Sequence, residues 1–567
     1  MEIDKLLAVA RGDAPADLIL ANARVVNTLT AEIEELNVAI SQGLIAGVGN
    51  YEQGNEILDL EGKFLIPGLI NGHIHLESSH LSPAEYARAV VPRGVLGVVT
   101  DFHEIANVCG IAGVEYILKY AENLPLDIFG MAPSCVPATH METAGAELDA
   151  ERLGRILNLR NVVGLGEMMN FPGVMFGDPG VWAKLELFQG KVLDGHAPGL
   201  SGNNLNAYLA AGIGSDHECT TLEEAREKLR RGMHIMIREG SSEKNLEALL
   251  PLVTDRTFQR CMFVVDDRDC ADLKNDGDID AVVRKAITLG LDPIRAIQMA
   301  TINTAEYFRL SRLGAVAPGY RANLVVLHDL ESVLASTVFY DGKVVARKGE
   351  MTVSIESVTN DQLTHTVNIK PFIVDDLRIP AREGTFPVIE LIADQIVTRS
   401  IREEVKAEDG FIQPDMERDI LKLVVVERHK ATGNIGLGLV KGFGLKRGAL
   451  ASSIAHDSHN IVAVGTNDAD IVAAVKEIER QQGGIAITAD GKVLTSLALP
   501  IAGLLSEEPL EVMVSKFEEL KKTAAELGCR PAAPFATLSF LALPVIPELK
   551  LTDRGLVDVV AFKLIEE

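Results

Sequence analysis

Two histidines separated by a single residue, His73 and His75, form the most chemically suggestive pair in the chain. They follow a glycine-rich apolar stretch at residues 67–72. Side chains two positions apart on an extended strand point in the same direction, so both imidazoles can reach one metal ion. Such pairs also occur without a metal, and the interpretation therefore depends on what else the chain provides.

Other residue types that bind metals follow short apolar runs further along the chain. They are Glu167, His196, His217 and Asp266. Three of them also have ordinary interpretations: His196 as a turn residue, His217 as part of a surface charge cluster, and Asp266 as a strand-end turn or helix cap. Glu167 differs, because an unpaired carboxylate at the end of a buried strand would be costly.

Together with His73 and His75, these residues comprise four imidazoles and two carboxylates. A single tetrahedral ion cannot use them all, whereas two ions bridged by a shared carboxylate and a hydroxide can. The ordinary interpretations do not predict that every member falls at the end of an apolar run. The sequence therefore predicts a dinuclear hydrolytic metal centre.

The elements that must position these residues lie between residues 67 and 316, where short apolar runs alternate with amphipathic segments of helical length. This alternation indicates repeated β–α units and a parallel sheet. After a first strand at His73 and His75, seven more are predicted at 95–101, 128–133, 162–167, 192–196, 211–217, 234–239 and 262–266. Eight units in about 250 residues match a (β/α)8 TIM barrel, whose chemistry lies at the C-terminal ends of the strands.

The predicted fold is therefore α/β, with smaller parts on either side of the barrel. Short strands and turns over 1–66 and 317–351 predict a small flanking β-sandwich, with a hairpin turn at Asp341-Gly342. Residues 352–567 contain predicted strands and helices that do not alternate regularly as they do in the barrel. We expect an additional C-terminal α+β domain there. Within it, the contiguous residues 456–459 (His-Asp-Ser-His) cannot form a catalytic triad. We expect a loop that packs on the barrel mouth, acts as a lid or contacts another subunit.

The composition excludes several classes of function. The formal net charge of −26 disfavours binding to nucleic acid or to anionic membranes, which leaves a small-molecule substrate. The six cysteines contain no C-x-x-C pair and fit reduced thiols. The chain shows no signal-like N-terminal segment and no apolar run long enough to span a membrane, so a cytoplasmic location is expected.

Five motifs of this chain resemble those of the amidohydrolase superfamily and, more narrowly, of bacterial-type adenine deaminases. The motifs are HIHLESS at 73–79, HEIANV at 103–108, GLGEMM at 164–169, DGHAP at 194–198 and SDHEC at 215–219. The resemblance extends over the whole chain, including the C-terminal region. It implies hydrolytic deamination of adenine to hypoxanthine and ammonia by a metal-activated hydroxide.

The resemblance also implies a ligand set and a pair of metal ions. The ions would be Mn2+ or Fe2+, with Zn2+ less expected. The ligands would be His73, His75, Glu167, His196, His217 and Asp266. Glu167 would bridge the ions, a place that a carboxylated lysine takes in some relatives, and no lysine occurs at 164–170. Asp266 would also be the catalytic base that passes a proton from water to the leaving amine.

Further catalytic and substrate-binding residues are expected beside these ligands. Glu77 is expected to protonate or hydrogen-bond the purine, with orientation of His75 as the alternative. His103 is expected to act in catalysis or to hold a ligand, and Glu104 shares its place at the end of the second strand. Arg238 is expected to bind substrate, with an ion pair to the adjacent glutamate as the alternative. The substrate-binding set is thus Glu77, His103, Glu104 and Arg238.

Two other functions remain open at this stage. A cyclic amidase, such as a dihydroorotase or hydantoinase, would share the fold, because fold does not decide substrate. A non-catalytic purine-binding relative would share the fold without the chemistry. The zinc nucleobase deaminases of the other type are excluded, because they need a Pro-Cys-x-x-Cys motif that this sequence lacks. The expected partners are adenine and a second copy of the chain in a homodimer, with no nucleic acid and no membrane.

Overall fold

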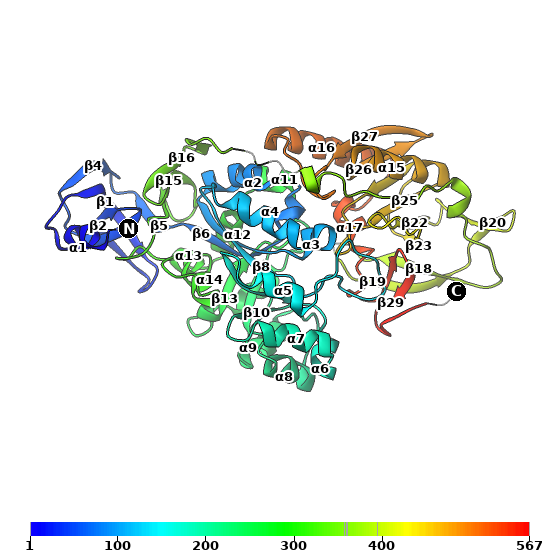
Figure 1. The fold of residues 1–567 in the computed structure, drawn as a ribbon, viewed down its shortest axis with the longest axis horizontal. Helices are drawn as coiled ribbons and strands as arrows, with labels where there is room; N and C mark the ends of the chain where they lie inside the picture. The colour runs from blue at the N-terminus through cyan, green and yellow to red at the C-terminus, as the bar shows by residue number, and fades with distance from the viewer. Residues whose placement is uncertain (1, 357, 359–360, 394, 566–567) are drawn as a thin grey trace.

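The computed structural model describes residues 2–356, 358, 361–393 and 395–565. Figure 1 shows three parts along the long axis of the molecule: an N-terminal β-rich part, a central part with mixed strands and helices, and a C-terminal part. Within the described residues, no helix combines the length and the apolar character that crossing a membrane requires.

The first part is a nine-stranded sheet built from two segments that are far apart in the chain. Its order is β17-β16-β15-β14-β5-β1-β2-β3, with β4 paired to β1. The strands are β1 (Ala16–Asn27), β2 (Glu32–Ser41), β3 (Leu44–Gly49), β4 (Gly54–Asp59), β5 (Phe64–Pro67), β14 (Leu324–Leu327), β15 (Ala335–Tyr340), β16 (Lys343–Arg347) and β17 (Glu350–Met351). Strand β14 runs antiparallel to β5, which joins the two segments. The hairpin turn between β15 and β16 is confirmed, with positive φ at Asp341 and Gly342.

The central part contains eight parallel strands in two sheets. One sheet has the order β10-β9-β8-β7-β6 and the other β11-β12-β13. The strands are β6 (Leu69–Ile74), β7 (Val95–Asp101), β8 (Asp127–Ala132), β9 (Val162–Met168), β10 (Val192–Gly195), β11 (Ser215–Asp216), β12 (His234–Arg238) and β13 (Cys261–Val264). A parallel bridge between Ile74 and Asp266 joins the two sheets on one side. On the other side, the amide of Gly214 donates to the carbonyl of Leu193 at 2.9 Å. The result is an α/β, TIM-barrel-like fold.

The sixth barrel strand is shorter than the sequence predicts. We expected a strand over 211–217, and only Ser215–Asp216 forms one. Gly212 adopts φ +97°, which turns the backbone away from the extended conformation. The other barrel strands agree with their predictions to within a few residues, and all seven residues of β7 are buried, as expected for a parallel strand covered on both faces.

The helices of the central part surround the strands (Figure 1). They are α2 (Pro83–Val90), α3 (His103–Cys109), α4 (Ile111–Ala121), α5 (Ala150–Ile156), α6 (Phe171–Phe176), α7 (Pro179–Leu187), α8 (Gly202–Ala210), α9 (Leu222–Arg230), α10 (Leu246–Leu249), α11 (Cys270–Asn275), α12 (Ile279–Thr288), α13 (Pro293–Met299) and α14 (Ile302–Tyr307). Helix α2 begins with an N-terminal capping motif: the Ser82 side chain accepts from the Glu85 amide, and Pro83 takes the first helical position.

The C-terminal part is centred on an eight-stranded sheet of order β19-β18-β23-β22-β25-β24-β26-β27. These strands are β18 (Phe386–Leu391), β19 (Thr398–Glu403), β22 (Ile420–Val426), β23 (Ile435–Lys441), β24 (Ala449–Ser452), β25 (Ile461–Gly465), β26 (Gly484–Ala489) and β27 (Lys492–Ala498). The main helices are α15 (Asp468–Gln481), α16 (Leu510–Glu526) and α17 (Pro534–Phe540). The loop between β24 and β25, residues 453–460, reaches the barrel mouth and is called the β24–β25 loop below.

Candidate active site

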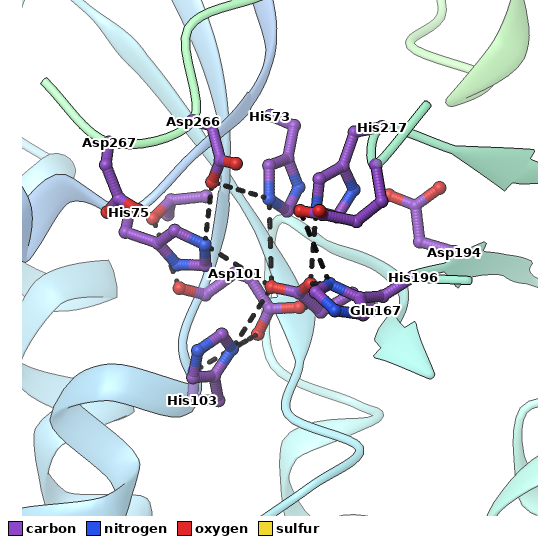
Figure 2. Close-up of polar contacts among 12 residues, drawn as sticks. His73, His75, Asp101, His103, Glu167, Asp194, His196, His217, Asp266 and Asp267 are labelled. Carbon is purple, nitrogen blue, oxygen red and sulfur yellow. Dashed lines mark hydrogen bonds and ion pairs between the residues drawn. The ribbon is translucent and has the colours of Figure 1, made fainter. Parts of the chain in front are cut away.

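The carboxylate of Glu167, near the end of β9, lies between two pairs of histidines (Figure 2). Its Oε1 atom is 3.3 Å from Nε2 of His75 and 3.8 Å from Nε2 of His73. Its Oε2 atom is 2.7 Å from Nδ1 of His196 and 3.2 Å from Nε2 of His217. The two oxygens of one carboxylate therefore face two separate pairs of imidazoles, as a bridge between two metal ions requires.

Asp266 completes the group around His73 and His75. Its Oδ1 atom lies 3.4 Å from Nε2 of His73 and 3.1 Å from Nε2 of His75. The backbone fixes this position, because the Asp266 amide donates to the His73 carbonyl and the His75 amide donates to the Asp266 carbonyl. Asp266 adopts φ +62°, in the left-handed region that residues other than glycine seldom occupy.

A buried network behind the second histidine pair holds His196 and His217. The Tyr208 hydroxyl accepts from the His196 amide at 3.1 Å and donates to the Met168 carbonyl at 2.8 Å, which ties the ends of β9 and β10 together. Lys228 forms a 3.0 Å ion pair with Asp216 and also donates to the carbonyl of Ala197. The residues next to both histidines are therefore locked in place.

Arg238, at the end of β12, forms ion pairs on both sides. Its Nη1 donates to Oδ2 of Asp266 at 2.7 Å, and its guanidinium also pairs with Glu218. The alternative pair with Glu239 does not form, because Glu239 instead pairs with Lys285. Arg238 thus holds the oxygen of Asp266 that points away from the histidines.

His103 and Glu104 lie at the end of β7, beside the first histidine pair. The Asp101 carboxylate accepts from the amides of His103 and Glu167 and so positions both residues. His103 Nε2 is 3.0 Å from Oε1 of Glu104, and its Nδ1 is 3.6 Å from Oε1 of Glu167. The two residues therefore extend the metal-ligand cluster toward the barrel mouth.

Glu77 lies apart from the residues that line the cavity. Its Oε1 accepts from the amide of Ile105 in α3 at 3.1 Å, and its side chain is buried. Burial and the nearby Glu104 raise the pKa of Glu77 to about 7. We expected a purine contact or an orienting hydrogen bond to His75, and no such bond to His75 forms among the described residues. In this position the carboxylate of Glu77 holds the first turn of α3 instead.

The β24–β25 loop brings further ionisable side chains to this cluster. His456 Nδ1 lies 2.6 Å from Oε1 of Glu104, and His459 contacts the other oxygen of Glu104. Asp457 Oδ1 lies 3.7 Å from Nε2 of His103. Of the three alternatives that the sequence left for this loop, packing on the barrel mouth is therefore the one observed.

The electrostatics of the cluster suit divalent cations. Burial alone would raise the pKa of Glu167, but the facing histidines, His217 and His196 above all, hold it well below its usual range. The pKa of Asp266 is held low in the same way by His73, His75 and Arg238. Nε2 of His73 is buried and makes no hydrogen bond to any described residue. Ionised carboxylates and an imidazole nitrogen without a partner, all converging on one space, fit a divalent metal site.

A cavity of about 330 Å³ opens over these groups. Its polar lining consists of His75, His103, Glu104, Glu167, His196, His217, Glu218, Arg238, Asp266, Asp267, His456 and Asp457. Apolar side chains complete the wall: Met169, Ile396, Phe540, Leu543 and Ile546. The barrel therefore supplies the candidate metal-binding residues, and the C-terminal part supplies most of the apolar wall.

The structure brings together every metal ligand that the sequence predicts, and it adds residues that the sequence reasoning missed. Asp101 stands two residues before His103 and Glu218 directly follows His217, and these positions at strand ends could have identified them. His456 and Asp457 belong to the loop for which the sequence suggested packing on the barrel mouth as one alternative, but nothing in a single sequence indicates that they meet Glu104 and His103.

Comparisons with known proteins agree with this geometry. Residues 64–400 match the amidohydrolase family, and residues 395–563 match the adenine deaminase C-terminal domain. An adenine deaminase of Dehalococcoides mccartyi is 62% identical over 565 residues, which cover 100% of this chain and 99% of that protein. Adenine deaminase 2 of Carboxydothermus hydrogenoformans is 50% identical over 564 residues, 99% of each chain. An adenine deaminase of Halalkalibacterium halodurans is 45% identical over 574 aligned positions, which cover 100% of this chain and 98% of the relative.

The two family matches together include the residues that form the candidate site. The amidohydrolase match contains all the strands that carry the histidines, Glu167 and Asp266. The match to the C-terminal domain contains the β24–β25 loop that contacts Glu104. The amidohydrolase family uses divalent metal ions, and the buried donor groups found here fit that use. The chain therefore belongs to the amidohydrolase superfamily and, within it, to the adenine deaminase family.

Proposed function

We propose that this protein hydrolyses adenine to hypoxanthine and ammonia at a pair of divalent metal ions. The observation that carries the proposal is the placement of Glu167, whose two oxygens face two different pairs of histidines. The full-length relatives named adenine deaminase support the choice of substrate. The cavity, with apolar walls and polar groups at its base, suits a small planar heterocycle.

Mn2+ or Fe2+ is the proposed metal, since imidazole and carboxylate donors together suit these ions. His73, His75 and Asp266 would hold one ion, His196 and His217 the other, and Glu167 would bridge them. When bound, the ions supply Lewis acidity that lowers the pKa of water toward neutrality, so that a nucleophile for carbon 6 of the base is available near pH 7.

Asp266 is the proposed proton carrier. Its Oδ1 faces the histidines and its Oδ2 is held by Arg238, so the carboxylate cannot rotate away from the reacting water. The same ion pair and the facing histidines keep the carboxylate ionised. Asp266 would accept a proton from water and pass it to the departing amine, as general acid–base catalysis requires. Arg238 would act through Asp266, as a positioning residue.

The proposed purine contacts come from the barrel mouth. His103 and Glu104 line the cavity beside the first histidine pair and are the proposed partners for the ring nitrogens. Glu77 would support them, because its contact with the Ile105 amide fixes the helix on which both residues lie. For the flanking parts we propose the architectures expected from the sequence, a small β-sandwich at the N-terminal side and an α+β domain at the C-terminal side.

Ammonia release from a panel of aminopurines and cyclic amides tests this function. The protein would be reconstituted separately with manganese, iron and zinc, and the metal content measured each time. We expect release from adenine with manganese or iron. Ring opening of a dihydropyrimidine or hydantoin without ammonia release from adenine would instead establish a cyclic amidase. Binding of adenine without turnover in any metal form would establish a non-catalytic purine-binding protein.

A further inference from the structure

Asp457 is a buried carboxylate that receives no hydrogen bond from any described residue. Its side chain is 2% exposed and lines the cavity above the metal ligands. The nearest polar nitrogens are Nε2 of His103 and Nδ1 of His456, at 3.7 and 4.0 Å from Oδ1. Its Oδ2 atom is fully enclosed and also lacks a partner. The carboxylate therefore lines the cavity without a hydrogen-bond donor from any described residue.

A carboxylate in this position needs a donor from whatever fills the cavity. An ionised carboxylate only accepts hydrogen bonds, and an unpaired one in a buried site is costly. The two neighbouring imidazoles are already engaged, because His103 and His456 both contact Oε1 of Glu104, at 3.0 and 2.6 Å. These two imidazoles therefore form their close contacts with Glu104. The oxygens of Asp457 remain available to accept hydrogen bonds.

A metal ion is one occupant that could satisfy Asp457. Donor atoms of His103, Glu104 and Asp457 lie within 4.8 Å of one another, a spacing that a cation could use. The two ions of the proposed centre, however, already have their ligands in His73, His75, Glu167, His196, His217 and Asp266, so neither of them requires this cluster. A neutral N–H group requires only the one acceptor that is left, and it suits the apolar wall of Phe540, Leu543 and Ile546.

We propose that Asp457 accepts a hydrogen bond from the five-membered-ring N–H of the purine base. This inference rests on the proposed function. Adenine has two kinds of N–H donor: the 6-amino group, which must lie at the metal ligands for the reaction, and the ring N–H at N9 or N7. The ring N–H is present in substrate and product alike. Asp457 lines the same cavity, with His103 between it and Glu167, and is the acceptor for it.

This contact selects the free base over its nucleosides. A substituent at N9 removes the N–H of the common tautomer and leaves Asp457 unpaired in a buried site. Sites built around a substrate N–H or O–H reject analogues that lack it by as much as about 10⁴-fold, because the polar group of the protein loses its partner. The C-terminal part of the chain would thus determine specificity, while the barrel carries the chemistry.

Two matched pairs of analogues test the contact without adding bulk. In the first pair, 7-deazaadenine and 4-aminofuro[2,3-d]pyrimidine differ only by N–H or oxygen at the position of N9. In the second, 9-deazaadenine and 4-aminofuro[3,2-d]pyrimidine differ in the same way at N7. Inhibition constants against adenine are measured with the manganese-loaded, full-length protein. We expect the N–H member of one pair to bind at least about tenfold more tightly than its oxygen counterpart.

Variants then assign that preference to Asp457. In Asp457→Asn the amide can offer either N–H or C=O, so the preference should fall to nearly one. The matched control is Glu142→Gln, a nearby buried carboxylate that does not line the cavity and whose Oε1 accepts from the Thr139 amide. This variant should keep the wild-type preference, and metal content is measured for every variant.

Three results would overturn the inference. Equal binding within both pairs by the wild type would mean that no ring N–H is recognised. A preference that persists in Asp457→Asn would assign it to another residue. Loss of one metal equivalent in Asp457→Asn would make the cluster a cation site. Failure of the proposed function looks different, because the wild type would then not deaminate adenine at all.

Discussion

Nδ1 of His456 lies 2.6 Å from Oε1 of Glu104, and this contact joins the β24–β25 loop to the mouth of the barrel. Both side chains are buried. Glu104 in turn contacts His103, which lies beside the metal-ligand cluster. The C-terminal part therefore reaches the site through Glu104 and also lines the cavity with residues of its own, and the barrel mouth is incomplete without it.

A chain truncated after residue 351 should accordingly lose at least about 100-fold in deaminase activity, because misplacing groups around a substrate costs that much. The truncation removes His456, Asp457 and the apolar wall of the cavity. Ammonia release measures the loss, and circular dichroism checks that the barrel is folded. A folded barrel with full activity would show that the C-terminal part takes no part in the site.

Replacement of Glu167 by alanine should lower the metal content from two ions per chain to one or fewer. The carboxylate faces both histidine pairs, so its removal deprives both ions of a ligand. Elemental analysis of protein grown with manganese measures the change. Glu142→Gln serves as the control, since it alters a buried carboxylate away from the cavity. Retention of two ions in the Glu167 variant would show that this residue is not a bridge.

The proximity of the candidate metal-binding residues was predictable from the sequence because parallel strands place their C-terminal ends on one edge of a barrel. His196 directly follows β10 and His217 directly follows β11, so a strand prediction accurate to a few residues was sufficient to bring them together. Even the short strand β11 did not harm the prediction, because its end, and not its beginning, determines where His217 lies.

The cavity wall could not be predicted in this way. Asp457 and Phe540 reach the site through packing between domains, which leaves no periodic pattern in a single sequence. The role of Arg238 was also ambiguous. Sequence proximity favoured a pair with Glu239, whereas neighbouring residues of a strand point to opposite faces, so that Arg238 meets Asp266 and Glu239 meets Lys285.

Asp266→Asn should lower turnover by about 10² to 10⁴-fold, the usual contribution of general acid–base catalysis, and leave most of the metal bound. Asparagine keeps an oxygen near His73 and His75 but accepts a proton far less readily than a carboxylate. Steady-state rates with adenine and elemental analysis on the same sample give both quantities. Near-normal turnover would exclude Asp266 as the base.

Lys228→Met should destabilise the fold by about 3–5 kcal/mol, because it leaves the buried carboxylate of Asp216 without its partner. Both side chains are fully buried, and their 3.0 Å pair lies directly behind His217. Urea denaturation measures the loss. The exposed lysine of α15, Lys476, provides the control, and its replacement by methionine should change stability by less than about 0.5 kcal/mol. Equal changes in the free energy of unfolding for the two substitutions would show that the buried pair does not contribute to stability.

Lys550, in β28 (Leu549–Thr552), should make the stability of the protein increase with pH. Its side chain is fully buried, and among the residues that the structure describes its amino group donates only to the Ile396 carbonyl, at 2.9 Å. Burial lowers the pKa of Lys550 from 10.5 to about 7. Between these two values the unfolded chain binds a proton that the folded chain does not, so the free energy of unfolding rises with pH throughout this window.

Methionine has a similar unbranched shape and no charge, so Lys550→Met should remove this pH dependence. The difference in unfolding free energy, wild type minus variant, should rise by up to about 1.4 kcal/mol per pH unit above neutrality and level off near the pKa of free lysine. Urea denaturation of both proteins at several pH values between neutrality and pH 10 measures it. Parallel pH profiles would mean that Lys550 stays protonated in the folded protein, because only a lysine that gives up its proton on folding produces the slope.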